Sequence, residues 1–299
     1  MTDRSATVLV GIDGSEGSAD AVRWAARLAA GRNLRLELVH CVPIAALYYG
    51  GGPVGSEVLF DQLREDGDRI AAQAHTLALD TAPSVQVRTE VCLEPAPAAL
   101  IERSRGARML VLGRTGTGGF TGMLLGSTVA TVTSHARCPV TVVRGRPGGG
   151  AVPQEGPVVV GVDGSPAGEA AIAAGFEEAA FRRAPLVAVH AWADGAHDAF
   201  PASAGPGPRW ETLKPAEERL LAQRLAGWPE KYPEVPVERE LVRDRPRNAL
   251  LDASARAQLL VVGSRGRGGF TGMLLGSTSQ AVIHHAGCPV LVTRPETSW

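Results

Sequence analysis

The chain has 299 residues, of which 44% are hydrophobic and 20% are charged, as is typical of a folded globular protein. Its formal net charge is −1 and its only lysines are Lys214 and Lys231, a balance that argues against a nucleic-acid-binding protein. No apolar run approaches the length of a membrane span, and a short polar lead runs directly into a predicted strand, unlike a signal peptide. We therefore expect a cytoplasmic protein that binds neither nucleic acid nor membrane.

The first half of the chain alternates short apolar segments with longer segments of helical periodicity. The apolar segments predict strands, because parallel strands covered on both faces read as runs of apolar residues. Helices are predicted over residues 18–33 and 95–107, each with a glycine near its end. The predicted strands are residues 7–13, 34–41, 85–91, 109–113 and 140–143.

The same pattern returns 150 residues later, where Asp163 matches Asp13 and Gly263 matches Gly113. A repeat of this length predicts duplicated domains rather than a solenoid. The Pro- and Gly-rich stretch between the halves predicts a linker. We expect a first domain over residues 1–146, a linker over 147–156 and a second domain over 157–299. The strands predicted in the second half are residues 158–163, 186–192, 237–242, 259–263 and 290–293.

Strands that alternate with helices in this way predict an α/β fold with right-handed crossovers. We expect two tandem, open-twisted, five-stranded parallel sheets of order 3-2-1-4-5, with helices on both faces, that is, a Rossmann-like fold. Such sheets bind ligands at the carboxyl ends of strands 1 and 4, where the direction of sheet growth reverses. Residues 43–55 and 193–208, which follow the second strand of each half, are predicted to be loops over this edge or plain surface insertions.

A glycine-rich stretch, GGFTGMLLGST, occurs at residues 118–128 and again at 268–278. In the first copy Gly113, Gly116 and Gly126 are separated by two and nine residues, and the second copy keeps this spacing. Each series lies between a predicted strand and a predicted helix, where bare backbone amides and the first helical turn can hold a phosphate without lysine. These glycines could instead form turns only, but the duplication favours phosphate binding.

Asp13 and Asp163 each end the first strand of their half. They could cap the following helix, or they could accept hydrogen bonds from a ribose or support a metal on the phosphates. Their position at the reversal of the sheet favours a role in binding. A base would then lie against the end of the second strand, near Cys41 and Ala191. The preceding residues, His40 and His190, are interpreted as buried structural histidines.

The chain has four cysteines, and they form neither a CxxC pair nor a zinc-binding spacing. We interpret them as small buried residues in a reducing compartment. They are Cys41, Cys92, Cys138 and Cys288.

The sequences GRTGTGGFTGMLLGST and GSRGRGGFTGMLLGST resemble the G-2x-G-9x-G-[S/T] signature of the ATP-binding universal stress proteins. VGIDGS and VGVDGS, the VH that closes the second strand, and CPVTVV and CPVLVT are similar to the same family. The resemblance implies an ATP-type ligand in each half, with or without magnesium. The expected contacts in the first half are Gly11, Asp13, Cys41, Gly113, Arg114, Thr115, Gly116, Thr117, Gly118, Gly119, Gly126, Ser127 and Thr128. Those in the second half are Gly161, Asp163, Ala191, Gly263, Ser264, Arg265, Gly266, Arg267, Gly268, Gly269, Gly276, Ser277, Thr278 and Ser279.

The resemblance also implies pairing of domains through the fifth strand. Residues 140–143 and 290–292 are therefore candidates for an internal pseudo-dimer and for a homodimer. The family implies a role in the stress response together with an unidentified regulatory protein partner.

Binding does not by itself make an enzyme, and the sequence contains no GxxxxGK[ST] loop, HIGH-type motif or SGGxDS loop. No catalytic residue and no metal ligand is assigned. We favour a nucleotide-dependent sensor or signalling platform. The alternatives are a slow ATPase or autophosphorylating enzyme and, third, a nucleotide-free interaction scaffold. Phosphate acceptors in the enzymatic case would be Ser127, Thr128, Ser277 and Thr278.

Overall fold

The computed structural model describes residues 6–42, 56–116, 125–146, 150–192, 210–266 and 274–295. The chain divides into two compact units, Met1–Arg144 and Gly145–Trp299. The predicted loops at residues 43–55 and 193–208 lie outside the described residues. Among the residues that are described, no helix is both long enough and apolar enough to cross a bilayer.

The first unit contains a parallel sheet of five strands in the predicted order, β3-β2-β1-β4-β5. Central β1 pairs with β2 and β4, so that Val10 lies opposite both Leu38 and Val111. These side chains are fully buried, which explains why the strands read as continuous apolar runs. The strands are β1 (Thr7–Ile12), β2 (Arg35–Cys41), β3 (Gln86–Cys92), β4 (Met109–Gly113) and β5 (Val140–Val143).

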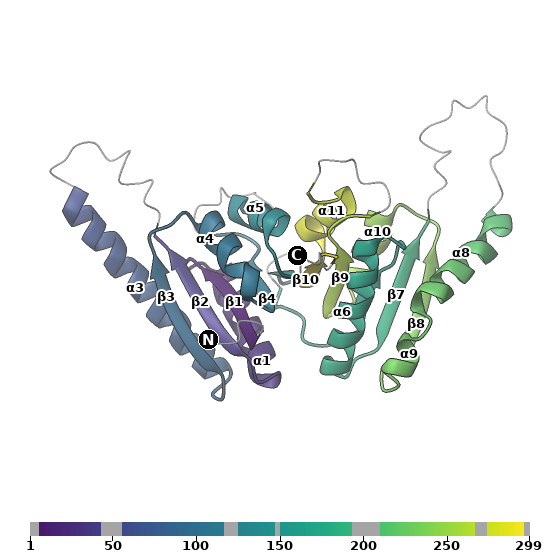
Figure 1. The fold of residues 1–299 in the computed structure, drawn as a ribbon, viewed down its shortest axis with the longest axis horizontal. Coiled ribbons are helices and arrows are strands. Elements are labelled where there is room, and N and C mark those ends of the chain that lie inside the picture. The colour runs from purple at the N-terminus through teal and green to yellow at the C-terminus, as the bar shows by residue number, and fades with distance from the viewer. Residues whose placement is uncertain are drawn as a thin grey trace, which may run out of the picture. The chain divides into compact units, whose positions relative to one another are not determined.

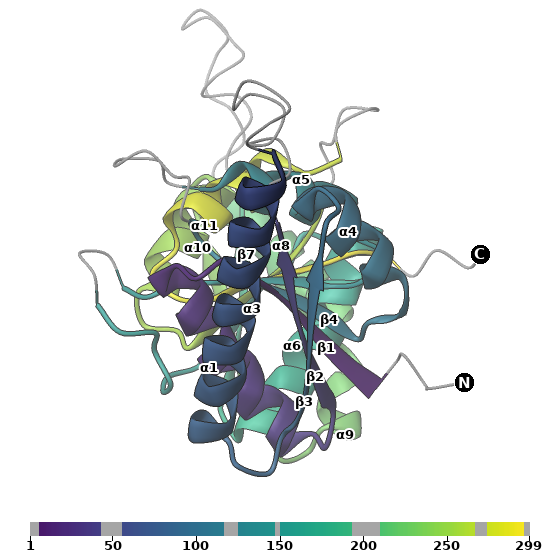
Figure 2. The same cartoon turned by 90° about the vertical axis from the view of Figure 1, so that its left-hand side faces the viewer.

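Helices cover both faces of this sheet, as predicted. In Figures 1 and 2, α1 (Glu16–Gly31) and α3 (Ser56–Thr81) pack side by side on one face, and the other face carries α4 (Ala96–Arg103) and α5 (Ser127–His135). A 3-10 turn, η2 (Ser104–Gly106), follows α4, so the helix predicted over 95–107 is divided in two. The buried side of α1 repeats at helical spacing through Ala21, Trp24, Ala25 and Leu28.

The second unit repeats the topology, with strand order β8-β7-β6-β9-β10. Its strands are β6 (Val158–Gly161), β7 (Leu186–Ala191), β8 (Val237–Val242), β9 (Leu259–Gly263) and β10 (Val290–Thr293). Its helices are α6 (Pro166–Arg182), α8 (Trp210–Leu225), the short α9 (Trp228–Lys231), α10 (Pro246–Ser254) and α11 (Ser277–His285). Both halves therefore have the doubly wound fold expected from the sequence.

The two units differ in one helix. The first unit has the continuous helix α3, whereas its counterpart in the second unit is divided into α8 and α9. Gly227, with φ of 81°, separates α8 from α9 and allows the chain to turn there. Phe176 of α6 stacks on Trp228 and Tyr232, with ring centroids 5.4 and 5.7 Å apart. The first unit has alanine at all three matching positions, 26, 78 and 82, and all three are buried. Aromatic packing thus holds the shorter helix in the second unit only.

Candidate functional site

The predicted site residues of the first and fourth strands meet at the carboxyl edge of each sheet. Asp13 directly follows β1, and Gly113 is the last residue of the adjacent strand β4. A side chain on Gly116 would collide with Oδ2 of Asp13, and a Cβ on Gly266 would lie 2.5 Å from Oδ2 of Asp163. In both units, therefore, the carboxylate lies against the second glycine of the signature.

The other carboxylate oxygen of each aspartate holds the turn that leads into the next helix. The amide of Ser15 donates to Oδ1 of Asp13 at 3.0 Å, and the amide of Ser165 donates to Oδ1 of Asp163 at 3.0 Å. Gly14, which lies between Asp13 and Ser15, has φ of 80°, a conformation that glycine adopts without strain. The aspartate therefore shapes the turn with Oδ1 while Oδ2 points toward the glycine loop.

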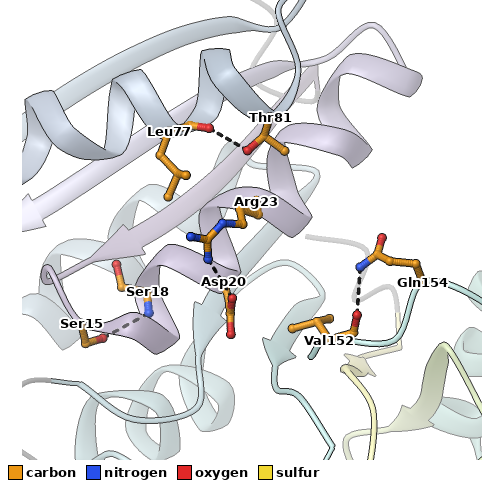
Figure 3. A network of polar contacts seen from close by, with 8 residues as sticks. All are labelled: Ser15, Ser18, Asp20, Arg23, Leu77, Thr81, Val152 and Gln154. Atoms are coloured by element: carbon orange, nitrogen blue, oxygen red, sulfur yellow. Dashed lines mark hydrogen bonds and ion pairs between the residues drawn. The ribbon is translucent and has the colours of Figure 1, made fainter. Parts of the chain in front are cut away.

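Ser15, and not Asp13, is the N-cap of helix α1. Its Oγ accepts a hydrogen bond from the amide of Ser18 at 3.1 Å (Figure 3) and donates to the carbonyl of Thr115 at 3.2 Å. In the second unit Ser165 accepts from the amide of Gly168 at 3.0 Å. Sequence reasoning missed these serines, although serine directly before a helix is a capping signal. Through Ser15 the start of α1 is tied to the loop that follows β4.

Replacing Ser15 with alanine is expected to lower the free energy of unfolding by about 1 kcal/mol, because the amide of Ser18 loses its capping partner. Urea denaturation followed by circular dichroism measures the change. The matched control is Ser134→Ala, since this hydroxyl donates back to the carbonyl of Ala130 within α5 and caps no helix. An unchanged unfolding midpoint for Ser15→Ala would show that the cap contributes nothing.

At Gly113 and Gly263 the missing side chain leaves room for a neighbouring helix. A Cβ on Gly113 would overlap the backbone of Gly17 in the first turn of α1, and one on Gly263 would lie 2.7 Å from the carbonyl of Ala167 in α6. Neither glycine is among the residues with positive φ. The missing side chains thus allow the helix to pack against the end of the strand, and a nucleotide contact by these two glycines stays a prediction.

Gly11 and Gly161 also face the protein interior. Side chains there would meet Leu100 and Leu112 in the first unit, at 3.0 and 2.7 Å, and the corresponding side chains in the second. Ser279 is buried and donates to the carbonyl of Gly263 at 2.7 Å, which directs its hydroxyl to the end of β9. Gly11, Gly161 and Ser279 therefore pack against the protein interior next to the site.

The third glycine of the signature begins the next helix beside the second glycine. Gly126 is the N-cap of α5; its amide donates to the carbonyl of Arg114 at 3.1 Å, and a Cβ on it would lie 3.8 Å from the amide nitrogen of Gly116. Within the described part of the chain, no side chain caps α5 or its counterpart α11. Backbone amides in the first turn of a helix can bind water or an anion.

The remaining expected contacts are placed around this edge or fall outside the description. Arg114, Thr115, Thr128 and Thr278 are partly exposed, whereas Ser127, Ser277 and Arg265 are exposed. Gly276 repeats the position of Gly126, Ser264 is buried and donates its amide to Thr293, and Cys41 and Ala191 end β2 and β7. The tip residues Thr117, Gly118, Gly119, Arg267, Gly268 and Gly269 lie outside the described residues.

The two histidines that precede this edge are structural, as predicted. Both are buried, and Nδ1 of His40 donates to the carbonyl of Ile12 at 3.0 Å, as Nδ1 of His190 does to Val162 at 2.6 Å. Nε2 of His190 also lies 2.8 Å from Glu217. In the described ranges, histidine, cysteine and acidic side chains form no group of three that could hold a metal ion.

Comparison with known proteins identifies the family of both halves. The sequence model of the universal stress protein family matches residues 5–144 and 156–294. Universal stress protein Rv2623 of Mycobacterium tuberculosis is 41% identical over 293 residues, covering 96% of both chains. A universal stress protein of Mycolicibacterium smegmatis is 42% identical over 291 residues, covering 96% of this chain and 97% of the relative.

A solved structure shares the fold over the full length. The universal stress protein from Archaeoglobus fulgidus superimposes with a TM-score of 0.67 at 18% identity, covering 97% of this chain and 99% of that one. Both halves thus carry the family pattern, in sequence and in strand order. The chain belongs to the universal stress protein family and contains two family domains in tandem.

Proposed function

We propose that each unit binds one adenine nucleotide, with ATP as the principal ligand, and that occupancy regulates partner binding in a stress response. The observation that carries the proposal is a shared cradle: the Asp carboxylate, the second signature glycine and the uncapped start of a helix adjoin in both units. Amides at the helix start suit phosphate oxygens, and Oδ2 of the aspartate suits ribose hydroxyls.

The same cradle would accept magnesium together with the phosphates. Asp13 and Asp163 have carboxylate oxygens, the ligand type that magnesium prefers, and they lie beside the proposed phosphate position. A bound magnesium ion would neutralise phosphate charge. This chain's own residues would orient the nucleotide: Ser15 and Ser165 brace the turn that presents the aspartate, and the amides of α5 and α11 face the anion.

Calorimetric titration of the full chain with ATP, with and without magnesium, tests the proposal. We expect two nucleotides per chain, one in each unit, and GTP titrated in parallel tests whether the proposed sites prefer adenine. ADP and cyclic AMP, titrated in parallel, identify the preferred adenosine ligand. A folded chain that binds none of these at millimolar concentration would support the nucleotide-free scaffold instead.

Asp13→Asn isolates the contribution of the carboxylate. Asparagine keeps the carbonyl oxygen that the amide of Ser15 needs, but it replaces Oδ2 by an NH2 group and removes the charge. We expect affinity at the first site to fall roughly tenfold or more, since a charge-assisted hydrogen bond is lost. Asp163→Asn should act in the same way on the second site.

The control for these variants is Asp66→Asn, on the exposed surface of α3, where the carboxylate pairs with Arg69 in the same helix. Unchanged ATP affinity in Asp13→Asn would show that this aspartate is not part of the site.

Incubation of the same samples with labelled ATP measures hydrolysis and labelling of the protein, and therefore tests the enzymatic alternative. Cytoplasmic location and pairing through the fifth strand remain predictions from the sequence.

A further inference from the structure

The first unit holds two cysteine side chains in contact at the end of its sheet. β2 and β3 are parallel, and Cys41 is paired with Cys92 at the last position of their ladder. The two sulfur atoms lie 3.1 Å apart, and beyond them the amide of Val42 donates to the carbonyl of Cys92 at 2.9 Å. The register of β2 and β3 therefore fixes the contact between the two cysteines.

The geometry of this pair is close to that of a disulfide bond. Neighbouring strands are about 4.8 Å apart, and disulfides join residues whose Cα atoms are about 4.4–6.8 Å apart. Bond formation would move the sulfur atoms together by about 1 Å, to the usual bond length. Side-chain rotation can provide this without displacing either strand.

The second unit shows that the family fold does not require these thiols. At the same ladder position it pairs Ala191 with Val242. The other two cysteines, Cys138 and Cys288, are counterparts of each other in the repeat, and each is followed by proline. Cys41 and Cys92 are therefore the cysteines that distinguish the first unit from the second.

The environment of the pair makes the Cys41 thiol slow to react with oxidants. Cys92 is buried and Cys41 is partly exposed, so a small oxidant reaches Cys41 more readily. Burial, and then the hydrogen bond that it shares with Cys92, raise the pKa of the Cys41 thiol well above its ordinary range, while Arg103 acts in the opposite direction. Since the thiolate is the reactive form, brief exposure to oxidant should leave the pair reduced.

We propose that Cys41 and Cys92 are a modification site that closes to an intramolecular disulfide bond when the protein is exposed to a peroxide. The Cys41 thiolate attacks the peroxide oxygen, the O–O bond breaks, and sulfenic acid and an alcohol or water are formed. The Cys92 sulfur then displaces the hydroxyl group, which leaves as water. In total, two thiols lose two electrons and two protons to one peroxide.

The cross-link would tie the outer strand β3 to β2 and enclose α3 in a covalent loop. β3 is the end strand of the first unit's sheet in the order β3-β2-β1-β4-β5. A covalent loop restricts the unfolded chain and so stabilises the folded one. Oxidation should therefore raise the unfolding temperature of the first unit, and dithiothreitol should reverse the change.

Hydrogen peroxide acting on the reduced full chain tests the proposal. After denaturation, the number of thiols that react with Ellman's reagent should fall from four to two, and unreduced peptide mapping should recover Cys41 linked to Cys92. The rate of disulfide formation should rise about tenfold per pH unit between about pH 7 and pH 9, because the fraction of Cys41 present as thiolate rises in that proportion at any pH below the pKa of this thiol.

Matched variants come from the second unit. Cys41→Ala and Cys92→Val introduce the residues found at the equivalent positions, and each should abolish the cross-link. Cys138→Ala should leave it intact. Four thiols remaining after prolonged oxidation, a cross-link that includes Cys138 or Cys288, a disulfide between two chains, or sulfinic acid at Cys41 without a cross-link would each overturn the proposal.

Discussion

Gly113→Ala is expected to weaken nucleotide binding in the first unit and to lower its free energy of unfolding by about 1–3 kcal/mol. The new methyl group would overlap the carbonyl of Gly17 and lie 2.8 Å from the amide nitrogen of Ser18. Both groups are backbone atoms in the first turn of α1, so they cannot rotate away. The helix start must move, and with it the turn through which Ser15 positions Asp13.

Urea denaturation and ATP titration of the same sample measure both effects. For the unfolding measurement, Gly126→Ala is the matched control in the same signature, because the nearest atoms to its Cβ would be 3.8 Å away. We expect it to cost less than about 1 kcal/mol, as an N-cap change from glycine to alanine. Gly263→Ala should repeat the Gly113 result in the second unit. Wild-type stability and affinity for Gly113→Ala would mean that α1 does not rest on the end of β4.

Phe176→Ala is expected to cost the second unit about 3–5 kcal/mol of unfolding free energy, the usual range for a fully buried phenylalanine. The substitution leaves a cavity and removes the one ring on which both Trp228 of α9 and Tyr232, the residue after α9, stack. The first unit has alanine at the matching position 26, where the partner positions 78 and 82 are also buried alanines and no aromatic ring needs a stacking partner.

Thermal unfolding monitored by tryptophan fluorescence follows this change near Trp228. The control is Leu274→Ala, where the side chain is 44% exposed and truncation should cost less than about 0.5 kcal/mol. Equal midpoints for Phe176→Ala and Leu274→Ala would show that the aromatic stack contributes no stability. A lower midpoint for Phe176→Ala alone would assign the packing of α9 to this ring.

Several features of the site were predictable because they depend on local pattern. Apolar runs marked the strands to within a few residues, and helix α1 begins at Glu16 rather than Ser18 because the cap is Ser15. The strand order then places Asp13 and the signature glycines at one edge. Nucleotide contacts by these residues stay a prediction.

The roles of individual glycines were not predictable, because glycine suits a turn, a ligand approach and close packing equally well. Only the packing of α1 against β4 shows that Gly113 accommodates the helix. The same holds for Ser279, which donates to Gly263 although its place in the signature suggests a ligand contact.

By itself the sequence determined the duplication, the α/β fold and the edge of the sheet at which the signature residues gather, since periodicity and repeated motifs are local properties of the chain. The tertiary structure alone decided that Ser15 donates to Thr115, 100 residues away, and that Cys41 meets Cys92, 51 residues away. Such contacts depend on strand register and on how the crossover helices pack, and side-chain periodicity does not specify either.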